Sequence, residues 1–290
     1  MKRFGRIMFC FLPALLAFGV QQLVSIPATG IAFLMSLYAD TVSSMDDAMN
    51  VFLTYITSGT FSVLISAAYG AFALAIFAFW YYKRFRHNET RGIIKNFNIP
   101  IICGIVLAVI GLQYTTTYVV SITAAIHPAW LEHYNSLMEM VGFDDVSVVL
   151  ALYSVFIAPI CEELIFRGVT MQYAKKVMPI WVANLFQALL FGIYHMNVIQ
   201  GVYAFFIGIF LGYICEKSGS IYTAIFFHAC FNLWGTFSPS WFMYRADEPL
   251  FFLLWLVVGI TLLVLGLLLS SYGYKKRNSK VNIFSASSDM

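Results

Sequence analysis

Long apolar runs broken by short charged segments constrain this 290-residue chain more than any other feature. A helix needs about 20 consecutive apolar residues to cross the hydrocarbon core of a bilayer, and several runs reach that length. Hydrophobic residues make up 61% of the chain and charged residues 11%, whereas soluble proteins are about half apolar and a quarter charged. The sequence therefore predicts an all-α, polytopic helix bundle, a multi-pass protein of the cell membrane.

The apolar runs predict about eight transmembrane helices. Lys2, Arg3 and Arg6 precede the first run, as in a signal peptide, but the run is much longer than a signal peptide's apolar core. We therefore expect it to remain in the protein as a helix. Short links between the runs favour one compact bundle over several domains. The expected helices lie near residues 7–38, 52–82, 99–125, 146–176, 180–196, 198–216, 220–238 and 249–272.

Basic residues are distributed unevenly between the two sides of this predicted bundle. With eight alternating helices, one side receives 15 of the 17 Lys and Arg residues and the other receives only Arg245. Cytoplasmic loops of membrane proteins carry an excess of basic residues, so both termini are predicted to be cytoplasmic. The net charge of +3 then reflects loops that face anionic lipid, and no nucleic-acid partner is expected. The 15 residues are Lys2, Arg3, Arg6, Lys83, Arg84, Arg86, Arg91, Lys95, Lys175, Lys176, Lys217, Lys275, Lys276, Arg277 and Lys280.

The segment PICEELIFRG, residues 159–168, places three ionisable side chains inside an apolar helix. Such residues are costly at membrane depth and mark candidate functional sites. Glu163 and Arg167 are four residues apart, so they share a helix face and can pair. Glu162 lies about 100° around the helix without a local partner, just after Pro159, which is expected to kink the helix. A purely structural polar cluster is the alternative, but an ion pair needs two charges and this segment has three.

Two later helices carry the other candidate polar residues. In FFHACFN, His228 and Asn232 lie one helical turn apart and are expected to face one cavity. In FGIYH, Phe191 lies one turn before His195 and is expected to pack against its ring. A glutamate in apolar surroundings can act as a general base toward water, and histidine and asparagine can orient the water or stabilise an oxyanion. These side chains are therefore suited to hydrolysis.

The same side chains leave a metal mechanism open. Glu162, His195 and His228 have the composition of a catalytic zinc site, although no compact H-E-x-x-H motif is present. Histidines that bind zinc usually donate a hydrogen bond to a nearby carboxylate. We expect Arg167 to occupy Glu163, which leaves no other intramembrane acid for that purpose. The sequence thus favours direct activation of water by Glu162, with no cofactor.

Three short motifs occur in a fixed order along the chain and resemble those of one family. EELIFR, FGIYH and HACFN are similar to the EExxxR, FxxxH and HxxxN motifs of the CPBP family, the CAAX proteases and bacteriocin-processing enzymes, also called the Abi family. The resemblance covers about residues 146–238 and implies an intramembrane endopeptidase. It implies that Glu162 activates water, assisted by His195. It also implies that His228 and Asn232 complete the catalytic set, and that Glu163 and Arg167 support it.

The resemblance divides the chain into three parts. N-terminal membrane helices are expected at 1–145, the catalytic core at 146–238, and the last transmembrane helix with a cytoplasmic tail at 239–290. The expected substrate is a membrane-associated or lipidated peptide, such as a prenylated CAAX tail or a leader peptide. Two other functions stay open: a catalytically idle scaffold, immunity or regulatory protein, and a transporter. A transporter would place polar residues in both halves of the chain, whereas here they are confined to the central part.

Reporter fusions test the predicted orientation. A reporter joined after Asn96 or after Lys276 should report the cytoplasm, and one joined after Met140 should report the exterior. Two predicted spans precede Asn96 and eight precede Lys276, so the chain has returned to the cytoplasm at both positions. Three predicted spans precede Met140, so that position lies outside. An exterior signal at Lys276 would contradict the eight-helix prediction.

Overall fold

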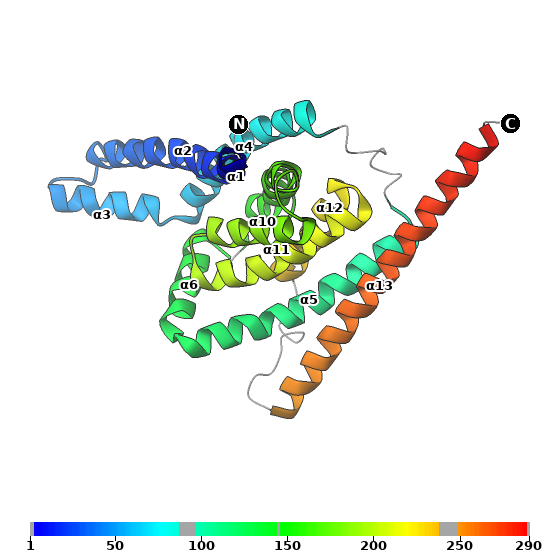
Figure 1. The fold of residues 1–290 in the computed structure, drawn as a ribbon. Coiled ribbons are helices and arrows are strands. Elements are labelled where there is room, and N and C mark those ends of the chain that lie inside the picture. Colours follow the sequence, from blue (N-terminus) through cyan, green and yellow to red (C-terminus); the bar gives the residue numbers. More distant parts are fainter. Residues whose placement is uncertain (1–2, 87–96, 144–145, 238–248, 289–290) are drawn as a thin grey trace.

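The computed structural model describes residues 3–86, 97–143, 146–237 and 249–288, and every regular element within these ranges is a helix (Figure 1). Within these described ranges, six helical segments are long and apolar enough to cross a bilayer. The predicted all-α class is confirmed, and the chain is a multi-pass membrane protein. The six segments are Phe4–Leu37, Gly59–Arg84, Ile99–Ile126, Val148–Ala174, Val198–Ser218 and Leu250–Arg277.

Two of the eight predicted spans correspond to shorter helices. The helix α10 (Ile180–Tyr194) has 15 residues and α12 (Ile221–Phe237) has 17. At 1.5 Å per residue they are about 22 and 26 Å long, less than the roughly 30 Å of a hydrocarbon core. They flank the longer α11 (Val198–Ser218). The predicted number of eight spans is therefore only partly matched, because six segments in the described part of the chain have the required length.

The predicted helix at 52–82 is divided into two helices. The first, α3 (Met45–Ile56), begins after Ser44, whose hydroxyl accepts a hydrogen bond from the N–H of Asp47. The second, α4 (Gly59–Arg84), begins after Ser58, whose hydroxyl accepts in the same way from the first turn. Serine is a preferred residue at these positions because it satisfies an N–H that has no partner within the helix. These caps explain why the chain breaks where hydrophobicity alone predicts continuity.

Other helix boundaries also differ from the prediction. The helix α6 (Pro128–Val141) lies in a segment that the sequence predicts to be a loop. The prediction misses this helix because its sequence is not a continuous apolar run. The first predicted helix consists of α1 (Arg3–Phe9) and α2 (Leu12–Leu37). The last helix, α13 (Pro249–Ser288), extends beyond its predicted end at residue 272. Hydrophobic runs thus locate the helices but not all of their ends.

The helices α5 (Ile99–Ile126) and α13 form a long antiparallel pair that extends from the rest of the bundle (Figure 1). A Cβ atom at Gly111 would lie 2.3 Å from the backbone nitrogen of Leu263. Glycine is therefore required for the two backbones to approach this closely.

One helical run at residues 148–174 carries the predicted EELIFR motif through the centre of the bundle. Its α-helical parts alternate with two π-helical segments, whose N–H groups bond to carbonyls five residues earlier. Both glutamates of the motif lie in the α-helical turn between these wider segments. The parts are α7 (Val148–Leu152), η3 (Tyr153–Ile157), α8 (Ala158–Glu163), η4 (Leu164–Thr170) and α9 (Met171–Ala174).

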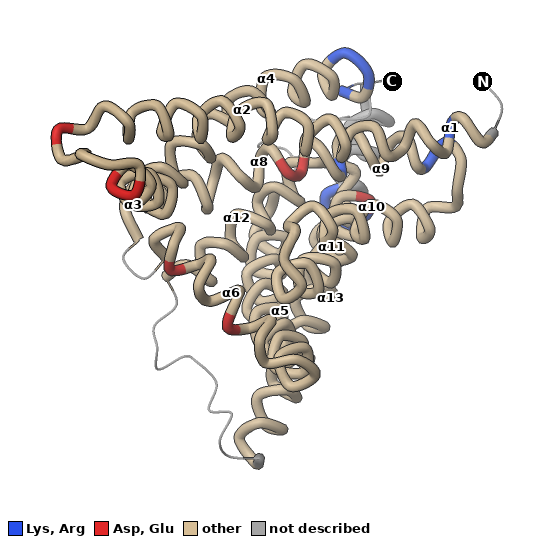
Figure 2. The backbone as a smooth tube through the Cα atoms, turned by 90° about the vertical axis from the view of Figure 1, so that its left-hand side faces the viewer, with Lys and Arg blue, Asp and Glu red and all other residues tan. Residues whose placement is uncertain are grey.

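Charged residues are separated along the bundle. In Figure 2, basic residues at the ends of α1 and α4 and around α9 lie toward one end, whereas the acidic residues of α3 and α6 lie away from them. The described basic and acidic residues of these helices thus lie in different parts of the bundle.

Candidate active site

Glu163 and Arg167 form a buried ion pair at the centre of the site. The Nη1 atom of Arg167 lies 2.8 Å from Oε1 of Glu163, and both side chains are fully buried. Arg167 also donates from Nη2 to the carbonyl of Gly208 in α11 at 3.1 Å, and its guanidinium lies 4.6 Å from the ring centroid of Phe191. The pairing predicted from the four-residue spacing is therefore present. Each charge would be costly at this depth without the other.

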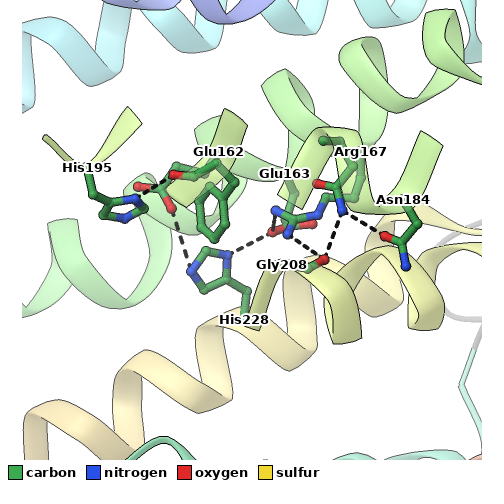
Figure 3. A network of polar contacts seen from close by, with 9 residues as sticks. Glu162, Glu163, Arg167, Asn184, His195, Gly208 and His228 are labelled. Atoms are coloured by element: carbon green, nitrogen blue, oxygen red, sulfur yellow. Dashed lines mark hydrogen bonds and ion pairs between the residues drawn. The ribbon is translucent and has the colours of Figure 1, made fainter. Parts of the chain in front are cut away.

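His228 of α12 connects this ion pair to the second glutamate (Figure 3). Its Nδ1 atom lies 2.8 Å from Oε1 of Glu163, and its Nε2 atom lies 3.6 Å from Oε2 of Glu162. An ionised carboxylate only accepts hydrogen bonds, so Nδ1 donates to Glu163. The prediction that Arg167 alone occupies Glu163 is wrong, because the same carboxylate oxygen also contacts His228. Glu163 therefore fixes the orientation of the ring that faces Glu162.

Glu162 occupies the more exposed edge of this network. Its side chain is 17% exposed, whereas that of Glu163 is fully buried. In Figure 3 its carboxylate lies between the rings of His228 and His195. The adjacent glutamates thus have different surroundings, one buried in an ion pair and the other accessible. A partly exposed carboxylate beside two imidazoles can accept a proton from water.

His195 is positioned by the C-terminal end of α10. Its Nδ1 atom lies 2.8 Å from the carbonyl oxygen of Phe191, to which it donates, so Nε2 of the neutral ring is an acceptor. The ring packs edge-on against Phe191 with centroids 4.8 Å apart, as the one-turn spacing predicts. Met196 follows with a φ of 53°, and Asn197 caps α11. This sharp turn holds the ring beside Glu162.

Asn232 uses one amide hydrogen to connect two helices. Its Nδ2 atom donates to the carbonyl of Ser154 in η3 at 2.8 Å. In the π-helical pattern, the N–H of residue 159 would bond to this carbonyl, but Pro159 has no N–H. Asn232 thus satisfies, with one of its two amide hydrogens, the carbonyl that the proline leaves unpaired in the helix.

Close packing of α10 on α11 brings two amides to the ion pair. Gln187 donates from Nε2 to the carbonyl of Gly208 at 2.9 Å, and Asn184 donates from Nδ2 to the carbonyl of Ile209 at 3.0 Å. A Cβ atom at Gly208 would lie 3.0 Å from the backbone of α10, so the absence of a side chain permits this approach. A search for ionisable residues alone misses both amides. Two polar residues three positions apart in an apolar helix are the signal that marks them.

The donor atoms of the site do not fit a metal ion in this arrangement. Within the described part of the chain, no group of three or more His, Cys, Asp or Glu side chains is arranged to hold a metal. One premise of the metal-free prediction is nevertheless wrong, because Glu163 does orient His228 through Nδ1. Carboxylates orient metal-bound histidines in the same way.

Residues 144–234 match the family model described as type II CAAX prenyl endopeptidase Rce1-like. No curated protein and no solved structure matches the chain. The matched segment contains all six predicted site residues, Glu162, Glu163, Arg167, His195, His228 and Asn232.

Substitution of the two adjacent glutamates should have different effects on stability. Glu163→Gln leaves Arg167 as an uncompensated buried charge and should destabilise the protein by about 3–5 kcal/mol. Glu162→Gln changes a partly exposed side chain outside that ion pair and should leave the protein near wild-type stability. Thermal unfolding of the purified proteins in detergent measures the difference.

A double variant serves as the control. Combining Glu163→Gln with Arg167→Met removes both charges of the pair and should recover part of the lost stability. Equal destabilisation by Glu162→Gln and Glu163→Gln would contradict the assignment of the ion pair to Glu163.

Proposed function

Because residues 144–234 match the Rce1-like family model, we propose that the chain is an intramembrane endopeptidase of the CPBP type whose hydrolytic water is activated by Glu162. The supporting observation is the difference between the adjacent glutamates. Glu163 is fully buried and contacts Arg167 and His228, whereas Glu162 is 17% exposed and faces the imidazole rings. This difference supports Glu162, and not Glu163, as the group that exchanges protons with water and substrate.

Glu162 and His195 share the two hydrogens of the attacking water. The Glu162 carboxylate accepts one hydrogen. The Nε2 atom of neutral His195 accepts the other and orients the water, because Nδ1 is held by the Phe191 carbonyl. The water oxygen forms a bond to the scissile carbonyl carbon as its proton moves to Glu162.

Addition of water converts the scissile carbonyl oxygen into an oxyanion. A His228 ring with protons on both nitrogens donates from Nδ1 to Glu163 and can donate from Nε2 to the oxyanion. The remaining amide hydrogen of Asn232 is a second donor. When the intermediate collapses, the C–N bond breaks and Glu162 returns its proton to the leaving amine. Glu163 and Arg167 hold His228 in place and do not touch the substrate.

The proposed substrate is a membrane-bound peptide with a prenylated CAAX terminus. The matched family model is that of a prenyl endopeptidase, and the site lies on helices within the apolar bundle. A lipidated peptide is concentrated in the membrane by its attached chain, which brings its peptide bond to such a site. The mechanism uses no cofactor, a proposal that metal analysis of the purified protein tests.

Cleavage assays with Glu162→Gln test the function. We expect cleavage of a prenylated CAAX peptide to fall by about 10²- to 10⁴-fold, the usual effect of losing a general base. Mass spectrometry of the products measures the rate with the protein in lipid nanodiscs. Glu216→Gln is a matched control, because Glu216 pairs with Lys175 on the protein surface, and its activity should equal that of the wild type.

The results of these assays distinguish the role of Glu162, the idle scaffold and the prenylated substrate. Wild-type cleavage by Glu162→Gln would contradict its role as the base. A wild-type protein that cleaves nothing, with a cellular phenotype that survives Glu162→Gln, would support the idle scaffold. Equal cleavage of the unprenylated peptide would overturn the substrate assignment alone.

A further inference from the structure

Two tyrosine hydroxyls from different helices meet beside the candidate active site. The hydroxyl of Tyr194, at the end of α10, donates a hydrogen bond to the hydroxyl of Tyr69 in α4. The Tyr69 side chain is only 7% exposed, so this pair lies inside the bundle. Buried tyrosine hydroxyls usually have a hydrogen-bond partner. This pair also links the helix that carries His195 to a helix outside the matched segment.

The position of the pair is set by contacts on both sides of Glu162. Cys161 donates from Sγ to the carbonyl of Gly70 at 3.4 Å, so the residue before Glu162 contacts the residue after Tyr69. On the other side, the rings of Tyr194 and His195 have centroids 6.1 Å apart. The pair therefore borders the space around the proposed base.

The hydrogen bonds of the site show which donors are available. His228 uses Nδ1 for Glu163, and Asn232 uses one amide hydrogen for the Ser154 carbonyl. Tyr69 accepts from Tyr194 and retains its own hydrogen to donate. A hydroxyl that accepts a hydrogen bond becomes a better donor, because hydrogen bonds in a chain polarise one another. Tyr69 is thus an uncharged donor that needs no added proton.

We propose that Tyr69 is a further catalytic residue, whose hydroxyl donates a hydrogen bond to the oxyanion formed when water adds to the scissile carbonyl. The proposal rests on the proposed function. Tyr69 transfers no proton: the water proton moves to Glu162 and then to the leaving amine, and Tyr69 keeps its hydrogen throughout. Tyr194 is a positioning residue, because it acts on the oxyanion only through Tyr69.

Tyr69→Phe tests the proposal by removing the hydroxyl and keeping the ring. We expect kcat for the prenylated peptide to fall by about 10²-fold, as when an oxyanion donor is lost, and KM to stay unchanged because the contact forms only in the transition state. Tyr194→Phe should cause a smaller loss. Tyr118→Phe is the matched control, because its buried hydroxyl bonds to the Phe252 carbonyl between α5 and α13, and its kcat should equal that of the wild type.

A transition-state analogue provides a measurement that does not depend on the yield of folded protein. A peptidyl trifluoromethyl ketone forms a tetrahedral hydrate, and Tyr69→Phe should weaken its binding by the same factor as kcat, with substrate affinity unchanged. Wild-type kcat and analogue affinity in Tyr69→Phe, with Glu162→Gln inactive, would overturn this proposal and leave the proposed function intact. Equal losses in Tyr69→Phe and Tyr194→Phe, with raised KM and lower thermal stability, would also overturn it in favour of a structural pair. Activity retained by Glu162→Gln would instead overturn the proposed function, and this proposal with it.

Discussion

One carboxylate oxygen of Glu163 contacts two positively charged or protonatable side chains inside the bundle. Its Oε1 atom lies 2.8 Å from both Arg167 and His228. An isolated charge is costly at membrane depth, and removing one member of a buried ion pair leaves the other uncompensated. The same contact also orients the His228 ring toward Glu162. The stability of the central helix and the geometry of the proposed reaction therefore depend on one interaction.

The packing around this contact brings four helices together. The run at 148–174 provides the two glutamates and Arg167, α12 provides His228, α11 provides the Gly208 carbonyl, and α10 provides Phe191. Irregular backbone is tolerated at membrane depth where protein groups satisfy its hydrogen bonds. The amide of Asn232 does this for η3. The structure thus combines π-helical turns in the central run with a side chain that satisfies the altered backbone.

Residue spacing predicts contacts within one helix better than contacts between helices. The Glu163–Arg167 pair and the packing of Phe191 on His195 follow from four-residue spacing, and both are present. The contact between Glu163 and His228 depends on how α12 packs against α8, which neither local sequence encodes. Hydrophobic runs predict most of the helices, because a helix that crosses a bilayer needs about 20 apolar residues. They miss α6, whose sequence is not a continuous apolar run, and they merge the end of α3 with α4.

Metal analysis of the purified, catalytically active protein tests most directly whether Glu162 activates water without a metal. Substitution of Glu162, His195 or His228 would abolish cleavage in either mechanism, and Glu163 orients His228 in both, so mutagenesis does not distinguish them. Direct activation by Glu162 predicts zinc well below one ion per protein and cleavage that is unaffected by a membrane-permeant chelator. Stoichiometric zinc that is lost together with activity on chelation, and regained with activity when zinc is added back, would contradict it.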